Sequence, residues 1–181
     1  MVERVSALAD EEMPLQFGPG LTLSERRVGS IWQLAAWPDR LGDVAATAAA
    51  SAGLSTAPGP LQADGSSMRL LRTEPLKLLL VSDEESAAPD LGGSGTIIDL
   101  SHARTVIRVE GALRADFMAR LMPLDLRPKA FPEGRIATSA IHHVAVTVDA
   151  RGGGLDLYCF RSFGRAMWEH LVETAEQFAV A

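Results

Sequence analysis

The stretch TIIDLSHARTVIRVEGALRADFMARLMPLDL, residues 96–126, is the part of the sequence that decides the fold. Thr96–Leu100 and Thr105–Glu110 are rich in β-branched residues, which predicts two strands, the second of them largely buried. Apolar residues at helical spacing then predict a helix over Ala112–Met122, which Pro123 ends. The apolar stripe of this helix is expected to face a sheet.

The same alternation of strands and helices continues to the end of the chain. Ile136–Thr138 and the long run Ile141–Val148 predict strands, and a glycine turn over Arg151–Gly154 leads into a strand at Leu155–Phe160. Apolar residues at helical spacing predict a final helix over Phe163–Phe178.

The N-terminal half repeats this order on a smaller scale. It predicts a strand over Ile31–Trp37, a helix over Arg40–Ala52 closed by Gly53, and paired strands over Met68–Leu71 and Leu76–Val81. The fold class is therefore α+β, with two ferredoxin-like lobes whose antiparallel sheets carry helices on one face.

Four segments follow from this reading. Residues 1–23 form an irregular N-terminal arm, 24–81 the first lobe, 82–95 a linker or loop rich in Gly, Pro and acids, and 96–181 the second lobe.

Composition narrows the range of partners. The net charge of -6 and the pI near 5.2 argue against a nucleic-acid surface, which requires clustered Lys and Arg. The first twenty residues lack a continuous apolar stretch, so neither a signal peptide nor a membrane span is expected, and we expect a cytoplasmic protein.

The tetrad Asp99-Leu100-Ser101-His102 is the first candidate for catalysis. No G-x-S-x-G motif surrounds Ser101, so a catalytic triad is disfavoured. A turn at the strand end, in which Asp99 and Ser101 bond nearby backbone donors, is the favoured interpretation.

The pair His142-His143 is the second candidate, as a metal site. In a strand the two rings would point to opposite faces, one into the core and one to the surface, and no acid or cysteine at i+2 or i+4 completes a ligand set. His170 on the charged side of the last helix is expected to be solvated. No metal ligand is therefore predicted.

Nucleophile and cofactor motifs are scarce as well. Cys159, in an apolar run, is expected to be a buried structural thiol. Gly92, Gly93 and Gly95 precede a strand instead of opening a helix, and G-x-x-x-x-G-K is absent. The sequence thus predicts no catalytic, cofactor-binding or metal-binding residue in this chain.

Aromatic residues suggest a protein interface instead. Trp32, Trp37 and Trp168 are core or contact candidates, and tryptophan is enriched at interfaces. We expect Trp32, Trp37 and Arg161 to contact a partner, with Arg161 pairing an acid on the neighbour.

Four motifs carry a resemblance to a known family: IIDLSHARTVIRVEG, LMPLDL, FPEGRIATSAIHHVAVTV and YCFRSFGRAMWEHL. Together they resemble the gamma subunit of bacterial heterotetrameric sarcosine oxidase. The resemblance covers about Thr96–Phe178, and the N-terminal half matches in layout.

The resemblance implies a fold similar to the folate-binding domains of glycine-cleavage aminomethyltransferases. Those transferases carry an acidic residue on the strand that corresponds to Ile141–Val148, where this chain has His142 and His143. With no carboxylate there to assist folate chemistry, a non-catalytic relative is implied.

The resemblance also implies an assembly that demethylates sarcosine oxidatively to glycine, with formaldehyde or methylene-tetrahydrofolate and hydrogen peroxide. In it, an alpha subunit holds NAD and a folate-binding domain, a beta subunit holds FAD and FMN, and a delta subunit binds zinc. The gamma chain has no cofactor and stabilises the complex by packing on the alpha subunit. An N-methylglutamate or dimethylglycine dehydrogenase complex, a standalone folate-binding protein with tetrahydrofolate as ligand, and a binding module for another metabolic complex remain alternatives.

Overall fold

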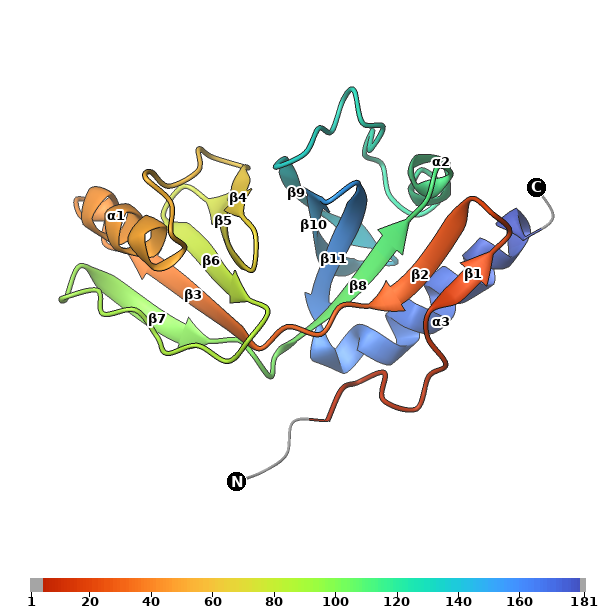
Figure 1. Cartoon of the computed structure of the whole chain (residues 1–181), viewed down its shortest axis with the longest axis horizontal. Helices are drawn as coiled ribbons and strands as arrows, with labels where there is room; N and C mark the ends of the chain where they lie inside the picture. Colours follow the sequence, from red (N-terminus) through yellow and green to blue (C-terminus); the bar gives the residue numbers. More distant parts are fainter. Residues whose placement is uncertain (1–4, 180–181) are drawn as a thin grey trace. The chain divides into compact units, whose positions relative to one another are not determined.

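The computed structural model describes residues 5–179, and the chain divides into two compact units. The terminal unit consists of Met1–Arg27 together with His102–Ala181, and the inner unit consists of Val28–Ser101. The inner unit is thus inserted in the sequence of the terminal unit (Figure 1).

The terminal unit is built on a six-stranded antiparallel sheet with the order β1-β2-β8-β11-β10-β9. Its strands are β1 (Leu15–Phe17), β2 (Leu21–Glu25), β8 (Arg104–Glu110), β9 (Ile136–Ile141), β10 (Val144–Arg151) and β11 (Gly154–Phe160). β2 lies beside β8, so segments on either side of the inner unit in the sequence share one sheet (Figure 1).

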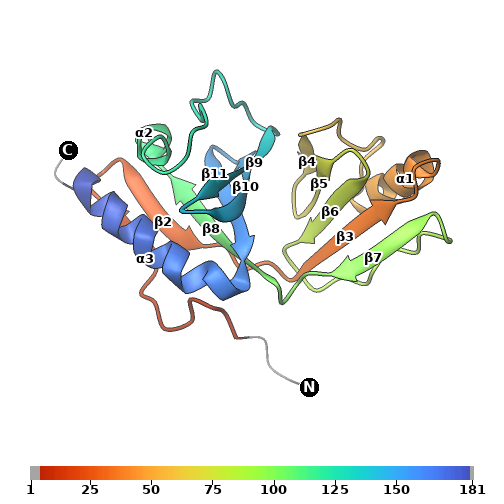
Figure 2. The same cartoon turned by 180° about the vertical axis from the view of Figure 1, so that it is seen from behind.

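Two helices pack on one face of this sheet. They are α2 (Arg114–Met118) and α3 (Gly164–Ala175), and short 3-10 turns, η1 (Arg161–Phe163) and η2 (Glu176–Phe178), flank α3. Phe117 of α2 and Trp168 of α3 are buried in one cluster with Leu23, Ile107 and Val146 from the strands. Figure 2 shows α3 lying across this face of the sheet.

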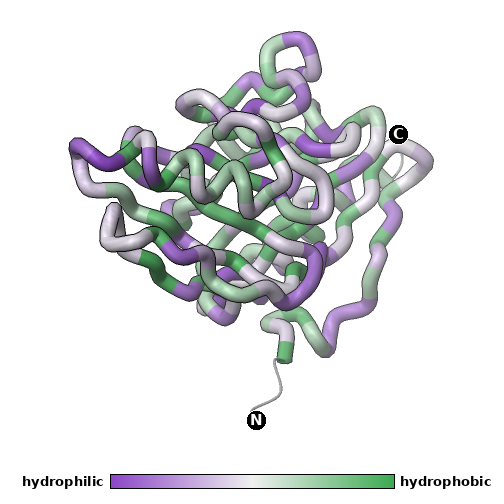
Figure 3. Tube along the Cα trace, turned by 60° about the vertical axis from the view of Figure 1, so that its left-hand side comes forward, coloured by the Kyte–Doolittle hydropathy of each residue, from purple (hydrophilic) through white to green (hydrophobic). Residues whose placement is uncertain are grey.

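The inner unit is a five-stranded antiparallel sheet with the order β4-β5-β6-β3-β7, together with one helix. The strands are β3 (Ser30–Ala36), β4 (Ala63–Gly65), β5 (Met68–Glu74), β6 (Lys77–Ser82) and β7 (Gly95–Asp99), and the helix is α1 (Leu41–Ser51). Val44 and Ala48 of α1 pack against Leu34, Leu78 and Leu80 of the sheet. Hydrophobic and hydrophilic stretches alternate along the trace of the chain (Figure 3).

The α+β class and the two antiparallel sheets are confirmed. So are most of the predicted elements, because their apolar periodicity is pronounced. The predicted helix over Ala112–Met122 is shorter: α2 ends at Met118, and the next residues form turns in which Arg120 and Leu121 donate to carbonyls three residues back.

The structure divides the chain at different places from those predicted. The arm over residues 1–23 is not irregular throughout, because β1 and β2 belong to the terminal sheet and Leu8 is buried. The segment 82–95 is a loop, as one of the two predicted options had it, but it connects β6 and β7 within the inner unit and does not link the units. β7, assigned to the second lobe by sequence, pairs with β3. The places of β2 and β7 both depend on strand pairing between segments that are distant in the sequence.

None of the helices in residues 5–179 has the length and apolar character needed to cross a membrane.

A pair of glycine substitutions tests the packing of the inner unit. A Cβ on Gly29 would lie 2.0 Å from the carbonyl carbon of Glu84, whereas a Cβ on Gly42 in α1 would meet nothing within 4 Å. We expect Gly29→Ala to lower the free energy of unfolding by about 1–3 kcal/mol because backbone must shift. Gly42→Ala should raise it by up to about 1 kcal/mol because alanine is the better helix former.

Urea unfolding followed by circular dichroism measures both changes. Equal stability of the two variants would contradict the close backbone approach at Gly29.

Candidate functional site

The tetrad Asp99–His102 forms the predicted turn. The Ser101 N–H donates to Asp99 Oδ1 at 2.8 Å, and the Ile31 N–H donates to Ser101 Oγ at 3.0 Å. Ser101 is buried and His102 is exposed. Asp99 therefore satisfies a nearby backbone donor, as predicted, whereas Ser101 satisfies a donor of β3 that lies 70 residues away in the sequence.

The two adjacent histidines lie in a turn and not in a strand. Ile141 pairs with Val144, so His142 and His143 are the two central residues of the β9–β10 hairpin, with φ of 46° and 68°. The prediction of one ring in the core was wrong, because both residues are exposed. A two-residue hairpin requires this left-handed backbone, and His supplies it here without Gly or Asn.

His170 is not simply solvated, as the sequence suggested. Its ring lies 4.1 Å from that of His142, measured between centroids, and the residue is half-buried. Burial and then the neighbouring His142 lower the pKa of His170. Within residues 5–179 no group of three or more potential metal ligands gathers here or elsewhere.

Cys159 is a structural thiol, as predicted. It is 1% exposed, its Sγ lies 3.8 Å from the Thr105 carbonyl oxygen, and burial raises its pKa to about 11. Such a thiol is protonated and unreactive near neutral pH.

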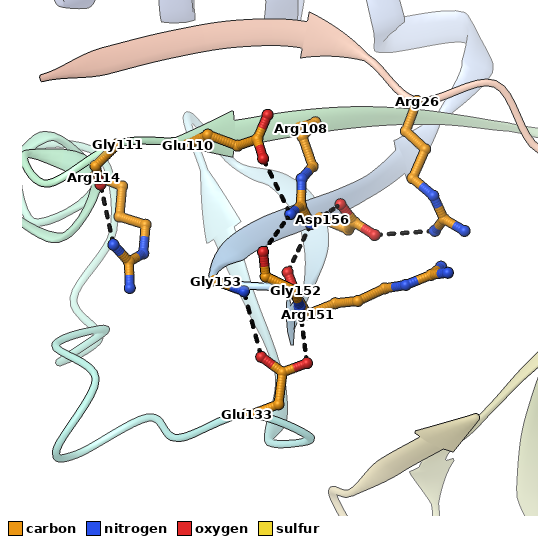
Figure 4. Close-up of polar contacts among 10 residues, drawn as sticks. All are labelled: Arg26, Arg108, Glu110, Gly111, Arg114, Glu133, Arg151, Gly152, Gly153 and Asp156. Carbon is orange, nitrogen blue, oxygen red and sulfur yellow. Dashed lines mark hydrogen bonds and ion pairs between the residues drawn. The ribbon is translucent and has the colours of Figure 1, made fainter. Parts of the chain in front are cut away.

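The main polar constellation is a cluster of buried charges that the sequence reading missed. Asp156 on β11 is fully buried and accepts hydrogen bonds from two guanidiniums. Arg26 Nη1 donates to its Oδ2 at 2.9 Å, and Arg108 Nη1 donates to its Oδ1 at 2.9 Å. Figure 4 shows the carboxylate between the two arginines.

Strand alternation explains where this ionic cluster lies. Leu155 and Leu157 on β11, and Ile107 and Val109 on β8, point to the face that the helices cover. Asp156, which lies opposite Arg108 in the register, therefore points to the other face. Polar residues on that face are expected in an antiparallel sheet; complete burial of a carboxylate there is not.

Arg108 also holds the β10–β11 turn. It donates to the carbonyl oxygens of Arg151 at 2.8 Å and Gly152 at 3.1 Å, and it pairs with Glu110 at 3.2 Å. A Cβ on Gly154 would lie 2.7 Å from this guanidinium, so glycine leaves room for the arginine. The Gly152 N–H in turn donates to Glu133 Oε1 at 2.8 Å (Figure 4).

A second buried carboxylate adjoins this group. Asp149 on β10 is fully buried and lies directly opposite Asp156 in the register. The sequence reading found no carboxylate in this region because it ended the strand at Val148; β10 continues to Arg151. The implied absence of an acid from this strand was therefore wrong, because β10 contains Asp149.

Tyr158 completes the polar face. Its hydroxyl is buried, and none of residues 5–179 forms a hydrogen bond with it. Burial, and after it the charges of Asp149 and Asp156, raise its pKa. The phenol therefore stays neutral over the physiological range.

The arrangement is suited to holding strands together. Both oxygens of Asp156 accept hydrogen bonds from guanidiniums, so neither oxygen is free to contact a substrate. The group joins β8, β11 and the residue that follows β2.

The three predicted contact residues lie in different surroundings. Trp32 is half-buried and donates through Nε1 to the Ser86 carbonyl oxygen at 3.2 Å; Trp37 is 49% exposed and donates to the Gly93 carbonyl oxygen at 3.0 Å. Arg161 is exposed and donates to the Val5 carbonyl oxygen at 2.9 Å. Trp168, the remaining tryptophan, is a core residue.

Comparison with known proteins supports the resemblance seen in the motifs. No family model matches the chain. Over 132 residues it is 32% identical to the sarcosine oxidase subunit gamma of Corynebacterium sp. (strain U-96), an alignment that covers 70% of this chain and 64% of that relative. The chain thus matches somewhat less than two thirds of the length of this relative.

The structural matches extend further. A chain of the heterotetrameric sarcosine oxidase from Corynebacterium sp. U-96, in complex with pyrrole 2-carboxylate, superposes with a TM-score of 0.84 and 26% identity, covering 98% of this chain and 97% of that one. The glycine cleavage system aminomethyltransferase T from Bartonella henselae matches with a TM-score of 0.56 and 12% identity, over 86% of this chain and 46% of that one. The predicted resemblance to the gamma subunit and the aminomethyltransferase-like fold are confirmed.

The ionic cluster is tested by Asp156→Asn. This change removes the anion that two partly buried guanidiniums share, so we expect a loss of about 3–5 kcal/mol in the free energy of unfolding. Asp125→Asn is the matched control, because it removes a carboxylate whose partner, Arg127, is exposed on the surface. Chemical denaturation of both variants makes the comparison. If the denaturation midpoint of Asp156→Asn lies as close to that of the wild type as the midpoint of Asp125→Asn does, the ionic cluster does not stabilise the fold.

The thiol of Cys159 gives a pH-dependent test. With a pKa of about 11, about one thiol in a thousand is ionised at pH 8, so a disulfide reagent should react with the folded chain far more slowly than with the unfolded chain. Because burial raises the pKa of Cys159 in the folded chain, its protonated thiol contributes fully to the free energy of unfolding below the pKa of an unfolded cysteine. This contribution is lost as the pH rises toward 11. Rapid labelling of the folded chain at pH 8 would contradict this.

Proposed function

We propose that this chain, which resembles a sarcosine oxidase gamma subunit in both sequence and fold, is the gamma subunit of a heterotetrameric sarcosine oxidase. In this role it is non-catalytic. It stabilises an assembly that demethylates sarcosine oxidatively to glycine, with formaldehyde or methylene-tetrahydrofolate and hydrogen peroxide as the other products.

One observation carries the proposal. The superposition on a chain of the heterotetrameric enzyme has a TM-score of 0.84 and covers 98% of this chain and 97% of that one, so the correspondence extends over both units. A shared domain alone would have matched only part of one chain.

The chemistry of the chain supports a non-catalytic role. The Ser101 hydroxyl oxygen accepts a backbone N–H, the Cys159 thiol is held protonated, and the Asp156 carboxylate is engaged by two arginines. Each of these three groups therefore has a structural task. This supports catalysis by other subunits.

The partners and cofactors follow from the proposed assembly. The chain packs directly on the alpha subunit, with beta and delta subunits in the same cytoplasmic complex, and FAD, FMN, NAD, zinc and tetrahydrofolate reside in those partners. Trp37 is a suitable anchor because its indole N–H is already bonded while half of its surface is exposed. Trp32 and Arg161 are the other proposed contacts.

A second candidate is a standalone folate-binding protein of the aminomethyltransferase type. The buried carboxylate of Asp149 favours it, since the sequence had implied that the strand corresponding to Ile141–Val148 offers no acid to assist folate chemistry, whereas β10 continues through Asp149. It predicts that the isolated chain binds tetrahydrofolate. Dehydrogenase complexes acting on N-methylglutamate or dimethylglycine differ from the first proposal only in the substrate of the partner subunits.

Co-expression with the alpha, beta and delta subunits of the same host tests the proposal. We expect the chain to co-elute with them in constant ratio in a fraction that shows flavin absorbance and oxidises sarcosine. Trp37→Ala should weaken this association because it removes an interface anchor, whereas Leu61→Ala, a similarly exposed control, should not. Analytical gel filtration with titration calorimetry measures both.

A chain that stays monomeric beside the flavin subunits and binds tetrahydrofolate alone would overturn the first proposal in favour of the second.

A further inference from the structure

Exposed apolar side chains gather at one corner of the terminal unit. Val5, Phe160 and Phe163 are 57%, 45% and 46% exposed, and they are three of the six large hydrophobic residues that are exposed among residues 5–179. Arg161 joins them, because its Nη2 donates to the Val5 carbonyl oxygen at 2.9 Å. We call Val5, Arg104, Phe160, Arg161 and Phe163 the β11–α3 corner.

The corner carries two cations without an acidic partner. The Arg104 guanidinium lies 4.2 Å from the centre of the Phe160 ring and donates to the Ala103 carbonyl oxygen. Neither Arg104 nor Arg161 forms an ion pair with a carboxylate of the described chain. Nearby Arg165, by contrast, is paired with Glu169 at 3.0 Å and with Glu11 at 3.8 Å.

This local excess of positive charge stands out in a chain with a net charge of -6. An arginine has five donors, and the contacts of Arg161 use one of them. The remaining donors can receive a carboxylate in the bidentate geometry that guanidinium favours.

A hollow of about 240 Å³ opens beside Phe163. Phe163, Met167 and His170 line it along one side, and the β9–β10 hairpin contributes the other side through Ile141, His142 and Val144. Phe163, Met167 and His170 are spaced four and three residues apart, so they share one face of the η1–α3 segment. Most of the lining is apolar and none of it is acidic.

Phe163 beside the hollow and Phe160 at the end of β11 are both half-exposed, which is costly in a free chain because each leaves apolar surface in water. Aromatic residues and arginine are also the residue types that dominate protein interfaces. The β11–α3 corner therefore has the composition of an interface centre, and its charge selects for an acidic partner.

We propose that the β11–α3 corner docks an acidic segment of the neighbouring subunit, which places one large apolar side chain in the hollow beside Phe163 and a carboxylate against Arg161. This inference rests on the proposed function, since the partner is the alpha subunit of that assembly. It goes further by assigning the contact to a surface that includes only one of the three predicted contact residues.

The experiment uses the complete co-expressed assembly. Phe163→Glu places a charge at the mouth of the hollow, and Arg161→Glu reverses the charge that the acidic segment meets. Because Phe163 and Arg161 are exposed, both variants should fold; thermal unfolding and circular dichroism of the isolated chain check this. Ile98→Glu, at an equally exposed position on β7, is the matched control.

Each corner variant should weaken assembly with the alpha subunit by roughly tenfold or more, as expected for interface hot spots, and the control by less than about twofold. Arg161→Lys should retain more affinity than Arg161→Glu, and the salt dependence of assembly should be smaller for Arg161→Glu than for the wild type.

Two negative results have different meanings. If the wild-type chain assembles and folded Phe163→Glu and Arg161→Glu assemble equally well, the docking surface is wrong while the proposed function stands. If the wild-type chain does not join the alpha subunit, the proposed function fails and the docking proposal fails with it.

Discussion

The buried carboxylate of Asp156 joins the two parts of the terminal unit that lie on either side of the inner unit in the sequence. Arg26 and Arg108 each donate to one of its oxygens. Arg26 is the second-last residue of the terminal unit before the inner unit begins at Val28. The Arg26 N–H also donates to the Val106 carbonyl oxygen at 2.9 Å, so backbone and side chain both fix this exit. Because 74 residues of another unit intervene in the sequence, from Val28 to Ser101, the two parts of the terminal unit depend on such long-range contacts.

Because Asp156 is fully buried, its carboxylate needs both partners. A carboxylate removed from water is tolerated only when its charge is compensated and its lone pairs are satisfied, and the two guanidiniums do both. Arg108 extends the same network to the β10–β11 turn through the Arg151 and Gly152 carbonyl oxygens. The ionic contacts on the polar face therefore fix the strand register, just as the apolar packing under the helices does on the other face.

The pairing of charges within the ionic cluster bears on the function of the chain. The acids and arginines of the ionic cluster satisfy one another, which leaves little capacity for proton transfer or nucleophilic attack. Exposed apolar surface lies at Phe160 and Phe163, and neither Arg104 nor Arg161 pairs with a carboxylate of the described residues. A chain of this kind is suited to contribute contact surface to an assembly whose catalytic groups lie elsewhere.

Local pattern was sufficient for the parts of the fold that depend on nearby residues. The apolar periodicity of β3, α1, β8 and α3 predicted these elements, and the run around Cys159 predicted a buried thiol. The turn at Asp99 and Ser101 could be predicted because such side chains bond backbone two residues away.

The His142-His143 turn was missed because histidine is an unusual residue for a backbone with positive φ, and Ile141 and Val144 on either side extend the apolar pattern of a strand.

What the sequence determined by itself is the α+β class, most of the strands and helices, and the family resemblance, since each of these depends on short-range spacing. Tertiary structure alone decided that β1 and β2 join β8, that β7 joins β3, and that Arg26 meets Asp156 130 residues away. The physical reason is that periodicity reports which face of an element is apolar, whereas strand pairing and buried ion pairs depend on partners that no local pattern identifies.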